Sequence, residues 1–573
     1  MTRIPWSIGL ELGILMLWWG SSAAQAPVAA TGREISGVVV SAKSGVPLAE
    51  ALVMLQRSSD RKSVNDTVTD AEGRFVFENL GDGKFDLIAS RSGYVRASYQ
   101  QHDGDVWTSI VTGDGLISTG LRFELSPQST IYGTVADESG DPVPMARLSL
   151  YSRDKSQGTG KMVRAAVTMA DAMGNFEFSQ MAPGSYFACA FGTPWYATRG
   201  TTPRDRQRDP ASESRLAALD VAYAPTCYPD VTDPNAAEAI SLAAGDRVAL
   251  NVIMHAVPTV HVRLQSPDWD SKHPPQIPQL SMEVFGIQEQ TTQNAMFYYA
   301  PESGDGATSG LAAVEIAGVP QGQYEMELPG QSGLSVKHMS IDAADGASID
   351  LAAATPIAAL TGKVTMENGG SLPAASFLWL KPRQGSADAI APVGADGTFT
   401  LQSVRPGEYD VLVSAGHWLA ITSLNAKGGA LRGHVLKVGS DPIELMATVT
   451  DANATVNGVV KREGVPKGGV FVVLAPDDPK SERGKWQPNQ SDSDGSFNFF
   501  HVAPGEYTVA AIEDGWTLDW SRPEVIAPYL AHGVKVIVAK GAREVNLNEA
   551  VEAQPLKLPP ANKVPDSALA VTP

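Results

Sequence analysis

Hydrophobic and polar residues alternate along most of this 573-residue chain, in short runs separated by turns. Phe497-Asn498-Phe499 places two aromatic rings on one face of a strand, and the chain turns at Pro504-Gly505 before resuming as Tyr507-Thr508-Val509. Alternation with a period of two, interrupted by turn residues at short intervals, predicts antiparallel strands. No long amphipathic helical pattern is evident in the sequence, so it predicts an all-β fold.

One motif with two glycines recurs along the chain. A turn ends at the first glycine, a short aromatic strand follows, and the second glycine comes ten residues after the first. The glycine pairs are Gly73 and Gly83, Gly174 and Gly184, Gly397 and Gly407, and Gly495 and Gly505. An aromatic residue stands two positions after each second glycine, at Phe85, Tyr186, Tyr409 and Tyr507. A degenerate fifth copy keeps Gly322 and Tyr324 but has Ala312 in place of the first glycine.

An earlier strand with its own glycine precedes each of the four close copies, at Gly37, Gly133, Gly362 and Gly458. The first two of these glycines are 96 residues apart and so are the last two, while the gap of 229 residues between them leaves room for one further unit and an insertion. This spacing predicts a tandem array of about five antiparallel Greek-key β-sandwiches.

The expected sandwiches span residues 34–126, 127–257, 258–353, 356–449 and 453–550. The second carries a loop insertion at 198–236 that is rich in Arg, Asp, Pro and Ser, and the third is the degenerate copy. Residues 551–573 are rich in proline and lack periodicity, which predicts a disordered tail.

The combined motif, G-x-V/T-x…P-x-x-x-A…D-x-x-G-x-F-x-F-x-x-x-x-P-G-x-Y, resembles the carboxypeptidase regulatory-like domain. That domain is related to transthyretin-like sandwiches and is also grouped with carbohydrate-binding-like folds. In metallocarboxypeptidases such a module follows the catalytic domain and is not itself the enzyme. Tandem copies are common in exported bacterial proteins, so the resemblance implies a non-catalytic exported protein.

The first 26 residues have the pattern of a signal peptide. Arg3 precedes a largely apolar run to Trp19, and small residues follow up to Ala26. Glu11 interrupts the run, and an uncleaved anchor is the alternative, although about ten apolar residues are few for a membrane span. The protein is therefore expected to be exported, either periplasmic or secreted, with no membrane span after removal of the signal.

The formal net charge of −19 argues against nucleic acid and anionic lipid as partners, because both are polyanions. Cys189 and Cys227 are the only cysteines. In an exported chain they are candidates for a disulfide, and two unrelated thiols are the alternative.

The sequence contains none of the common catalytic motifs. None of the nine histidines begins His-x-x-Glu, and the zincin, nucleophile-elbow, Walker and dinucleotide motifs are absent. The sequence thus predicts no catalytic residue, no metal ligand set, no cofactor and no enzyme activity. Asp492 and Asp494 look like part of a calcium loop, but the carboxylates shift position among the repeats, which favours a structural turn.

Aromatic residues recur nine positions after the motif aromatic, at Tyr94, Trp195, Trp418 and Trp516. Together with Tyr196 and Trp520 they are candidates for a platform that stacks on sugar rings or anchors a protein partner. The alternative is that each ring covers the open edge of its own sandwich. The sequence therefore favours an extracytoplasmic binding or scaffold protein, with carbohydrate binding second and an accessory part of a peptidase system a remote third; the partner would be a glycan or an extracytoplasmic protein.

Overall fold

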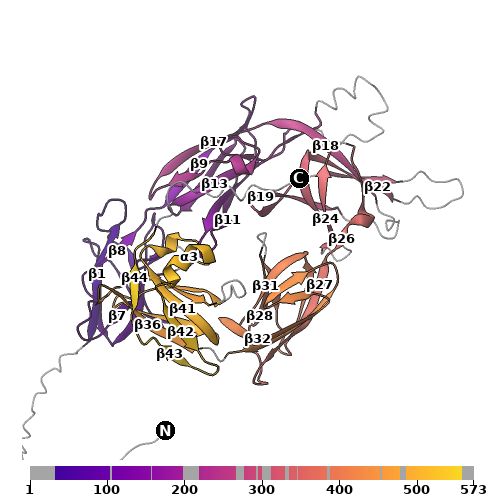
Figure 1. Cartoon of the computed structure of the whole chain (residues 1–573). Coiled ribbons are helices and arrows are strands. Elements are labelled where there is room, and N and C mark those ends of the chain that lie inside the picture. The colour runs from indigo at the N-terminus through magenta and orange to yellow at the C-terminus, as the bar shows by residue number, and fades with distance from the viewer. Residues whose placement is uncertain are drawn as a thin grey trace, which may run out of the picture.

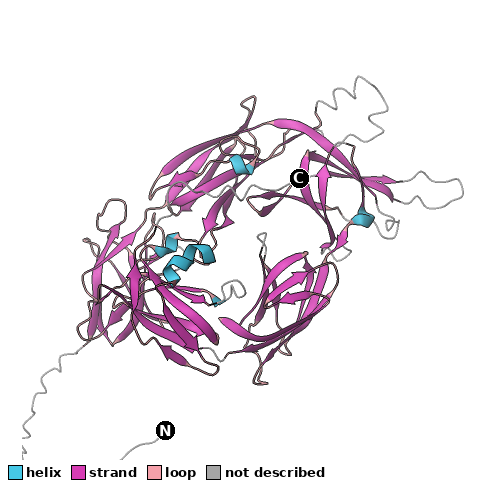
Figure 2. Ribbon diagram, viewed as in Figure 1, coloured by secondary structure: helices cyan, strands magenta, loops and turns pink. Residues whose placement is uncertain are grey.

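The computed structural model describes residues 32–102, 106–156, 158–197, 219–265, 277–291, 294–299, 311–329, 335–344, 346–383, 388–451, 454–477 and 485–557. Their regular secondary structure is almost entirely β-strand, as the sequence predicts (Figure 2). They form five β-sandwiches, numbered first to fifth in chain order, and each has a hydrophobic core of its own. The predicted signal peptide, residues 1–26, lies outside the described residues.

The first sandwich packs a sheet of order β4-β1-β8 against a sheet of order β3-β2-β5-β6, in which β7 also pairs with β5. Its strands are β1 (Arg33–Ser41), β2 (Leu52–Arg57), β3 (Ser63–Val68), β4 (Arg74–Leu80), β5 (Gly83–Ser90), β6 (Ala97–Ser98), β7 (Ile110–Thr112) and β8 (Leu121–Leu125). Inward-facing residues such as Phe75, Phe77 and Phe123 are at most 3% exposed, because alternation puts them all on the face between the sheets.

The second sandwich repeats this plan with sheets of order β12-β9-β17 and β11-β10-β13-β15. Its elements are β9 (Ser129–Asp137), β10 (Arg147–Asp154), β11 (Lys161–Met169), β12 (Asn175–Met181), β13 (Gly184–Phe191), β14 (Val221–Tyr223), β15 (Thr226–Cys227), the 3₁₀ helix η1 (Pro234–Ala236), β16 (Ile240–Leu242) and β17 (Arg247–Met254). Of the predicted insertion, 198–218 lies outside the described residues, and β14 pairs with the first strand of the third sandwich.

The degenerate third copy is also a sandwich, with sheets of order β14-β18-β22-β21 and β20-β19-β23-β24-β26. Its elements are β18 (Ala256–Gln265), β19 (Gln279–Val284), β20 (Ile287–Gln290), β21 (Asn294–Tyr299), β22 (Leu311–Pro320), β23 (Gly322–Pro329), β24 (Ser335–Ala343), β25 (Ser348–Asp350), η2 (Leu351–Ala353) and β26 (Thr355–Pro356). Loss of the first motif glycine has therefore not changed the type of fold.

In the fourth sandwich, β32 joins the two sheets into one path, β29-β28-β31-β32-β35-β27-β30. Its strands are β27 (Ala358–Met366), β28 (Phe377–Pro382), β29 (Ala389–Pro392), β30 (Thr398–Val404), β31 (Gly407–Ser414), β32 (Trp418–Lys427), β33 (Ala430–Arg432), β34 (Val435–Val438) and β35 (Ile443–Thr450).

The fifth sandwich carries a helix, α3, on the outside of one sheet. Its elements are β36 (Ala454–Arg462), β37 (Val465–Pro466), β38 (Phe471–Pro476), β39 (Gln487–Gln490), β40 (Ser496–Val502), β41 (Gly505–Ile512), η4 (Gly515–Thr517), α3 (Pro523–Leu530), β42 (Val534–Val538), β43 (Glu544–Asn546) and β44 (Val551–Gln554). Every residue of β38 is buried, because its outer face packs under Trp520, Ile526 and Tyr529 in a second hydrophobic cluster. Among the described residues, no helix has the length and apolar character needed to cross a membrane.

The expected tail boundary at 551 is wrong. Residues 551–554 form β44, which pairs with β36 and β41 and buries Val551. Four residues are too few to show periodicity against a proline-rich background, so this strand has no recognisable sequence pattern. Residues 558–573 lie outside the described residues.

The repeated residues have physical roles in the fold. Pairing is mostly antiparallel, but the first strand of each sandwich also pairs in parallel with a late strand, as β9 does with β17. A Cβ at Gly133 of β9 would overlap the carbonyl oxygen of Leu250 in β17, and Gly37 and Gly362 face the same restriction. The repeated tyrosines are buried, and each of Tyr186, Tyr324, Tyr409 and Tyr507 donates its hydroxyl to the carbonyl four residues earlier, at 2.8–2.9 Å.

The five sandwiches follow one another around a closed ring, so that the fifth lies beside the first and the second (Figure 1). Lys43 of the first pairs with Asp246 of the second at 3.1 Å. Buried Glu289 of the third binds Arg147 and Tyr151 of the second at 2.7 and 2.6 Å. Arg405 of the fourth pairs with Glu327 of the third. These three junctions are thus each held by side chains from both neighbours.

Candidate functional site at the junction of the fourth and fifth sandwiches

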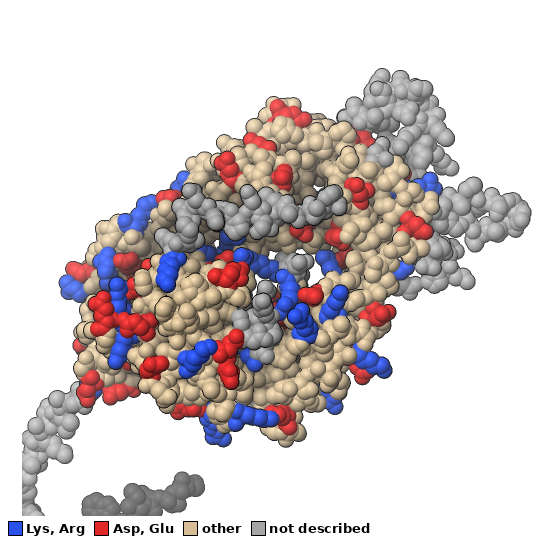
Figure 3. Space-filling model, viewed as in Figure 1, with Lys and Arg blue, Asp and Glu red and all other residues tan. Residues whose placement is uncertain are grey.

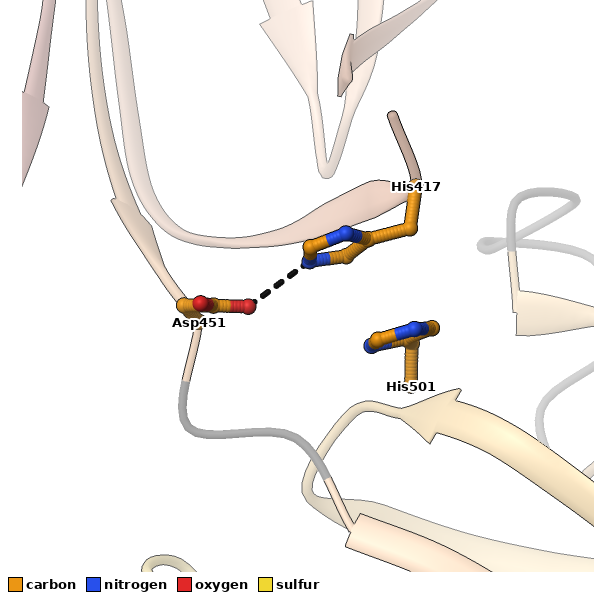
Figure 4. A group of neighbouring side chains, drawn as sticks. All are labelled: His417, Asp451 and His501. Carbon is orange, nitrogen blue, oxygen red and sulfur yellow. Dashed lines mark hydrogen bonds and ion pairs between the residues drawn. The ribbon is translucent and has the colours of Figure 1, made fainter. Parts of the chain in front are cut away.

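Three side chains capable of binding a metal meet where the fourth sandwich joins the fifth. His417, Asp451 and His501 each offer one ligand atom, and these atoms all lie within 4.8 Å of one another (Figure 4). His417 comes from the fourth sandwich and His501 from the fifth, while Asp451 lies between them directly after β35. Such a grouping of imidazole and carboxylate suits a divalent transition metal.

The local fold explains how each residue reaches this point. His417 ends a tight turn before β32, in which the amide of Ala415 donates to the carbonyl of His417 at 2.8 Å. His501 sits in a β-bulge of β40, because the three-residue step from Phe499 to Val502 faces a two-residue step from Val456 to Ala454 in β36. Its φ of 57° is left-handed, as at Asn79 and Gln180 in the equivalent bulges of the first and second sandwiches. A bulge re-aims its side chain, and here it aims His501 out of the fifth sandwich.

The two imidazole rings stack. Their centroids are 3.8 Å apart with planes 14° from parallel, and His417 Nε2 lies 2.7 Å from Asp451 Oδ1. Burial, and next the neighbouring His417, lower the pKa of His501, while Asp451 opposes the shift. The arrangement therefore favours a neutral His501 imidazole, whose nitrogen lone pair can bind a cation.

A cavity of about 70 Å³ lies between the same two sandwiches, and His501 lines it. Trp418, the residue after His417, forms part of its wall together with Asp410, Lys485 and Gln487. Trp418 is 42% exposed; its ring packs edge-on against Trp379, and Lys381 Nζ lies 5.3 Å from its centroid. One candidate aromatic from the sequence thus lies at a cavity with polar neighbours.

The other candidate aromatics do not join it. Tyr94 packs at the edge of the first core with Arg91 over its ring, while Trp195 is 74% exposed and touches Tyr196 edge-on. Trp516 stacks on His102 of the first sandwich with centroids 3.5 Å apart. Trp520 is 4% exposed beneath α3, so its inclusion in an exposed platform is wrong: the extra helix of the fifth sandwich covers it.

The turn at Asp492 and Asp494 is a contact between sandwiches. Asp492 is 5% exposed, lies 2.5 Å from Lys84 Nζ and accepts from the amide of Ser109, both in the first sandwich. Asp494 accepts from the amide and hydroxyl of Ser496 in its own turn. Protein donors therefore occupy the carboxylates that resembled half of a calcium loop.

The cysteines lie opposite each other on β13 and β15 and are joined as a disulfide, with an S–S distance of 2.03 Å. The bond lies in a small hydrophobic cluster with Tyr151 and with Val284 and Ile287 of the third sandwich. It therefore ties the end of the insertion to the face on which the third sandwich docks.

Comparison with known families identifies the type of domain. Residues 34–109 match the family model of the carboxypeptidase regulatory-like domain. Residues 454–528 match the model described as the second beta sandwich domain of the BOS complex subunit NOMO1-like family. The resemblance read from the repeats is confirmed by these matches, which cover most of the first sandwich and most of the fifth. No curated protein matches the chain significantly.

Solved structures align only loosely with the whole chain. A streptococcal ancillary pilin aligns at 11% identity over 51% of this chain and 99% of its own, with a TM-score of 0.17. The Bacillus anthracis TIE protein aligns at 8% identity over 91% and 75%, with a TM-score of 0.17. The shaft pilin SpaA from Lactobacillus rhamnosus GG aligns at 10% identity over 40% and 98%, with a TM-score of 0.19. Scores this low support no inference about the function of this chain.

Sequence reasoning missed His417, Asp451 and His501 as a group. They lie in two repeats and the link between them, so no local spacing connects them. One signal was available: His501 occupies the motif position held by Asn79 and Gln180 in other copies. A histidine there, and another beside Trp418, are departures from the repeat that point to a role outside the sandwich itself.

Proposed function

We propose that this chain is an exported, non-catalytic scaffold whose five sandwiches are held as one closed ring. The observation that supports it best is the contact between the first and fifth sandwiches, which are farthest apart in sequence. A string of modules joined only through neighbouring units would bend at every link, whereas a contact between its ends restrains all of them. A ring presents side chains from five modules in fixed relative positions to a glycan or an extracytoplasmic protein.

Direct hydrogen bonds make the closure specific. Gln490, which is 1% exposed, donates to the carbonyl of Gln100 and the hydroxyl of Thr108 at 2.9 and 2.7 Å. The amide of Ser493 donates to the carbonyl of Ser109 at 3.0 Å, and the amide of Val111 donates to the hydroxyl of Ser493 at 2.9 Å. Buried polar groups paired in this way would lose their partners if the ring opened, which penalises the open form.

The fifth sandwich also binds the second. Lys155 donates to the carbonyl of Thr517 at 2.7 Å, and the amide of Ser521 donates to the carbonyl of Gly158 at 2.9 Å. On the face of the ring drawn in Figure 3, acidic and basic side chains are interspersed. Charges of both signs are therefore mixed on this face, which suits a scaffold better than a binder of polyanions.

Spin-label distance measurements test the closed ring. Val64→Cys on β3 and Ile537→Cys on β42 place labels on exposed positions of the first and fifth sandwiches, and both native cysteines are already paired. A closed ring gives one narrow distance distribution. Asp492→Lys places its ammonium group opposite that of Lys84 across the contact. It should therefore broaden the distance distribution strongly.

Asp171→Lys is the matched control, because Asp171 holds the same position in the turn of the second sandwich and bonds to Asn175 within that turn. It should leave the distribution narrow. A broad distribution in the unaltered background would contradict the closed ring.

Carbohydrate binding at Trp418 is a second candidate function. It is supported by a half-exposed indole at a cavity with carboxylate, amide and ammonium neighbours, since sugar sites combine an aromatic face with polar groups. A glycan array probed with wild type, Trp418→Ala and Trp195→Ala tests it. Binding lost in Trp418→Ala alone would support this site, whereas binding that survives in Trp418→Ala would exclude it.

A further inference from the structure

We propose that His417, Asp451 and His501 bind one divalent transition-metal ion, with Zn²⁺ as the reference ion, and that this ion ties the fourth sandwich to the fifth. Two imidazoles and a carboxylate form a ligand set that Zn²⁺ and its first-row neighbours prefer. Mg²⁺ and Ca²⁺ favour oxygen ligands, so two histidines select against them. The site lies at a junction and is separate from the contact that closes the ring.

Binding of one ion requires the three ligand atoms to move closer together and both imidazole rings to turn. Ligand atoms around one tetrahedral Zn²⁺ lie about 3.3 Å apart, given metal–ligand bonds of about 2.0–2.1 Å. The three candidate atoms already lie within 4.8 Å of one another. Figure 4 shows a nitrogen of each ring on the side that faces Asp451. His417 Nε2 donates to Asp451 Oδ1, so a bound ion would replace that proton. Because the rings are stacked, both side chains must turn to direct these nitrogens to one point.

The local environment suits cation binding. His417 is partly buried and His501 remains accessible, so an ion can enter without unfolding either sandwich. Metal binding requires each imidazole to present an unprotonated ring nitrogen. Three protein ligands leave a coordination position for water, and the cavity of about 70 Å³ beside His501 has room for a water molecule.

The fold itself does not demand histidine at these positions. The bulge residue is Asn79 in the first sandwich and Gln180 in the second, each with φ of 59°, so other polar side chains serve the same backbone. The sandwich fold therefore does not require these metal-binding groups, although two imidazoles and a carboxylate from adjoining modules meet here. An ion bound by His417 of the fourth sandwich and His501 of the fifth would restrain the two sandwiches relative to each other.

The test uses the full, tag-free chain stripped with EDTA and then titrated with Zn²⁺ against a chromophoric chelator. We expect one Zn²⁺ per chain, with Co²⁺ giving the visible absorption of a nitrogen- and oxygen-ligated ion. His501→Asn and His417→Asn should each weaken Zn²⁺ binding at least tenfold. His501→Asn is well suited to this purpose, because asparagine already occupies the equivalent left-handed position at Asn79.

His532→Asn is the control, since His532 is exposed and lies outside the cluster. Zn²⁺ affinity unchanged in both cluster variants, or lost equally in His532→Asn, would overturn the proposal. So would the absence of Zn²⁺ binding by the wild type. Thermal unfolding gives a second readout: Zn²⁺ should raise the melting temperature of wild type and His532→Asn but not of His501→Asn, whose melting temperature without metal should match that of wild type.

Discussion

The ammonium group of Lys84 in the first sandwich lies 2.5 Å from the carboxylate of Asp492 in the fifth, across 408 residues of sequence. Asp492 is 5% exposed, and burial raises the pKa of its carboxyl even though Lys84 opposes that shift. Desolvation of the carboxylate thus outweighs its attraction to the cation. A buried pair of this kind contributes less to stability than to specificity, because either partner alone is left in an unfavourable environment.

Lys84→Ala should therefore weaken the contact between the first and fifth sandwiches by roughly 3 kcal/mol, since it leaves the buried Asp492 without its cation. Hydrogen exchange followed by mass spectrometry measures this loss as faster exchange in the peptides around residues 108–111 and 490–493. The double variant Lys84→Met with Asp492→Leu should exchange more slowly than Lys84→Ala. If the double variant were the least protected, the pair would be a net source of stability, contrary to this argument.

The contacts of His261 predict that stability at the junction of the second and third sandwiches depends on pH. His261 Nδ1 lies 2.6 Å from Glu315 Oε1, and its Nε2 lies 2.5 Å from Asp220 Oδ2. The hydrogen bond to Glu315 raises the pKa of His261, burial opposes this, and Asp220 raises it further. The folded-state pKa of His261 thus lies above the unfolded value of about 6.5. The stabilisation from the protonated ring is therefore fully present below about pH 6.5 and is lost as pH rises through the folded-state pKa.

His261→Gln should thus destabilise the chain more at pH 6 than at pH 9. Urea denaturation of wild type and variant at both values measures the difference in midpoint. His255→Gln, an exposed neighbour outside this triad, should show the same small effect at both pH values. An equal cost of His261→Gln at pH 6 and pH 9 would show that protonation of this ring does not stabilise the junction.

Two tryptophans that were candidates for the same exposed platform should differ in their effect on the free energy of unfolding. Trp520 is 4% exposed and packs against Phe471 and Trp486, whereas Trp195 is 74% exposed. Trp520→Ala should cost about 3–5 kcal/mol of unfolding free energy, because it leaves a large cavity beneath α3. Trp195→Ala should change it by less than about 0.5 kcal/mol. Denaturant midpoints measure both, and a similar cost for the two variants would contradict the burial of Trp520.

The repeats explain how far sequence reasoning could go. The first, second and fourth sandwiches need glycine where the first strand meets a parallel partner, as at Gly133. All five bury an aromatic at the position of Tyr507, so these residues recur and reveal the fold. Contacts between sandwiches involve residues that occur once. Asp492 has Gly394 as its counterpart in the fourth sandwich, and nothing in either local sequence indicates that Lys84 lies opposite. The ring and the histidine cluster depend on such single departures, and only the placement of whole sandwiches brings their partners together.

Two shortened chains can show where the fifth sandwich ends. A chain ending at Lys557 keeps β44, while a chain ending at Ala550 loses it together with the pairing of Val551 with Val460 and of Ala553 with Ala511. The shorter chain exposes the edges of β36 and β41 and opens the core at Val551, which is fully buried. Removal of one buried valine alone costs about 1.5–3 kcal/mol of transfer free energy. Limited proteolysis should therefore cleave the fifth sandwich of the shorter chain much faster, and equal cleavage rates would mean that β44 contributes little to the fold.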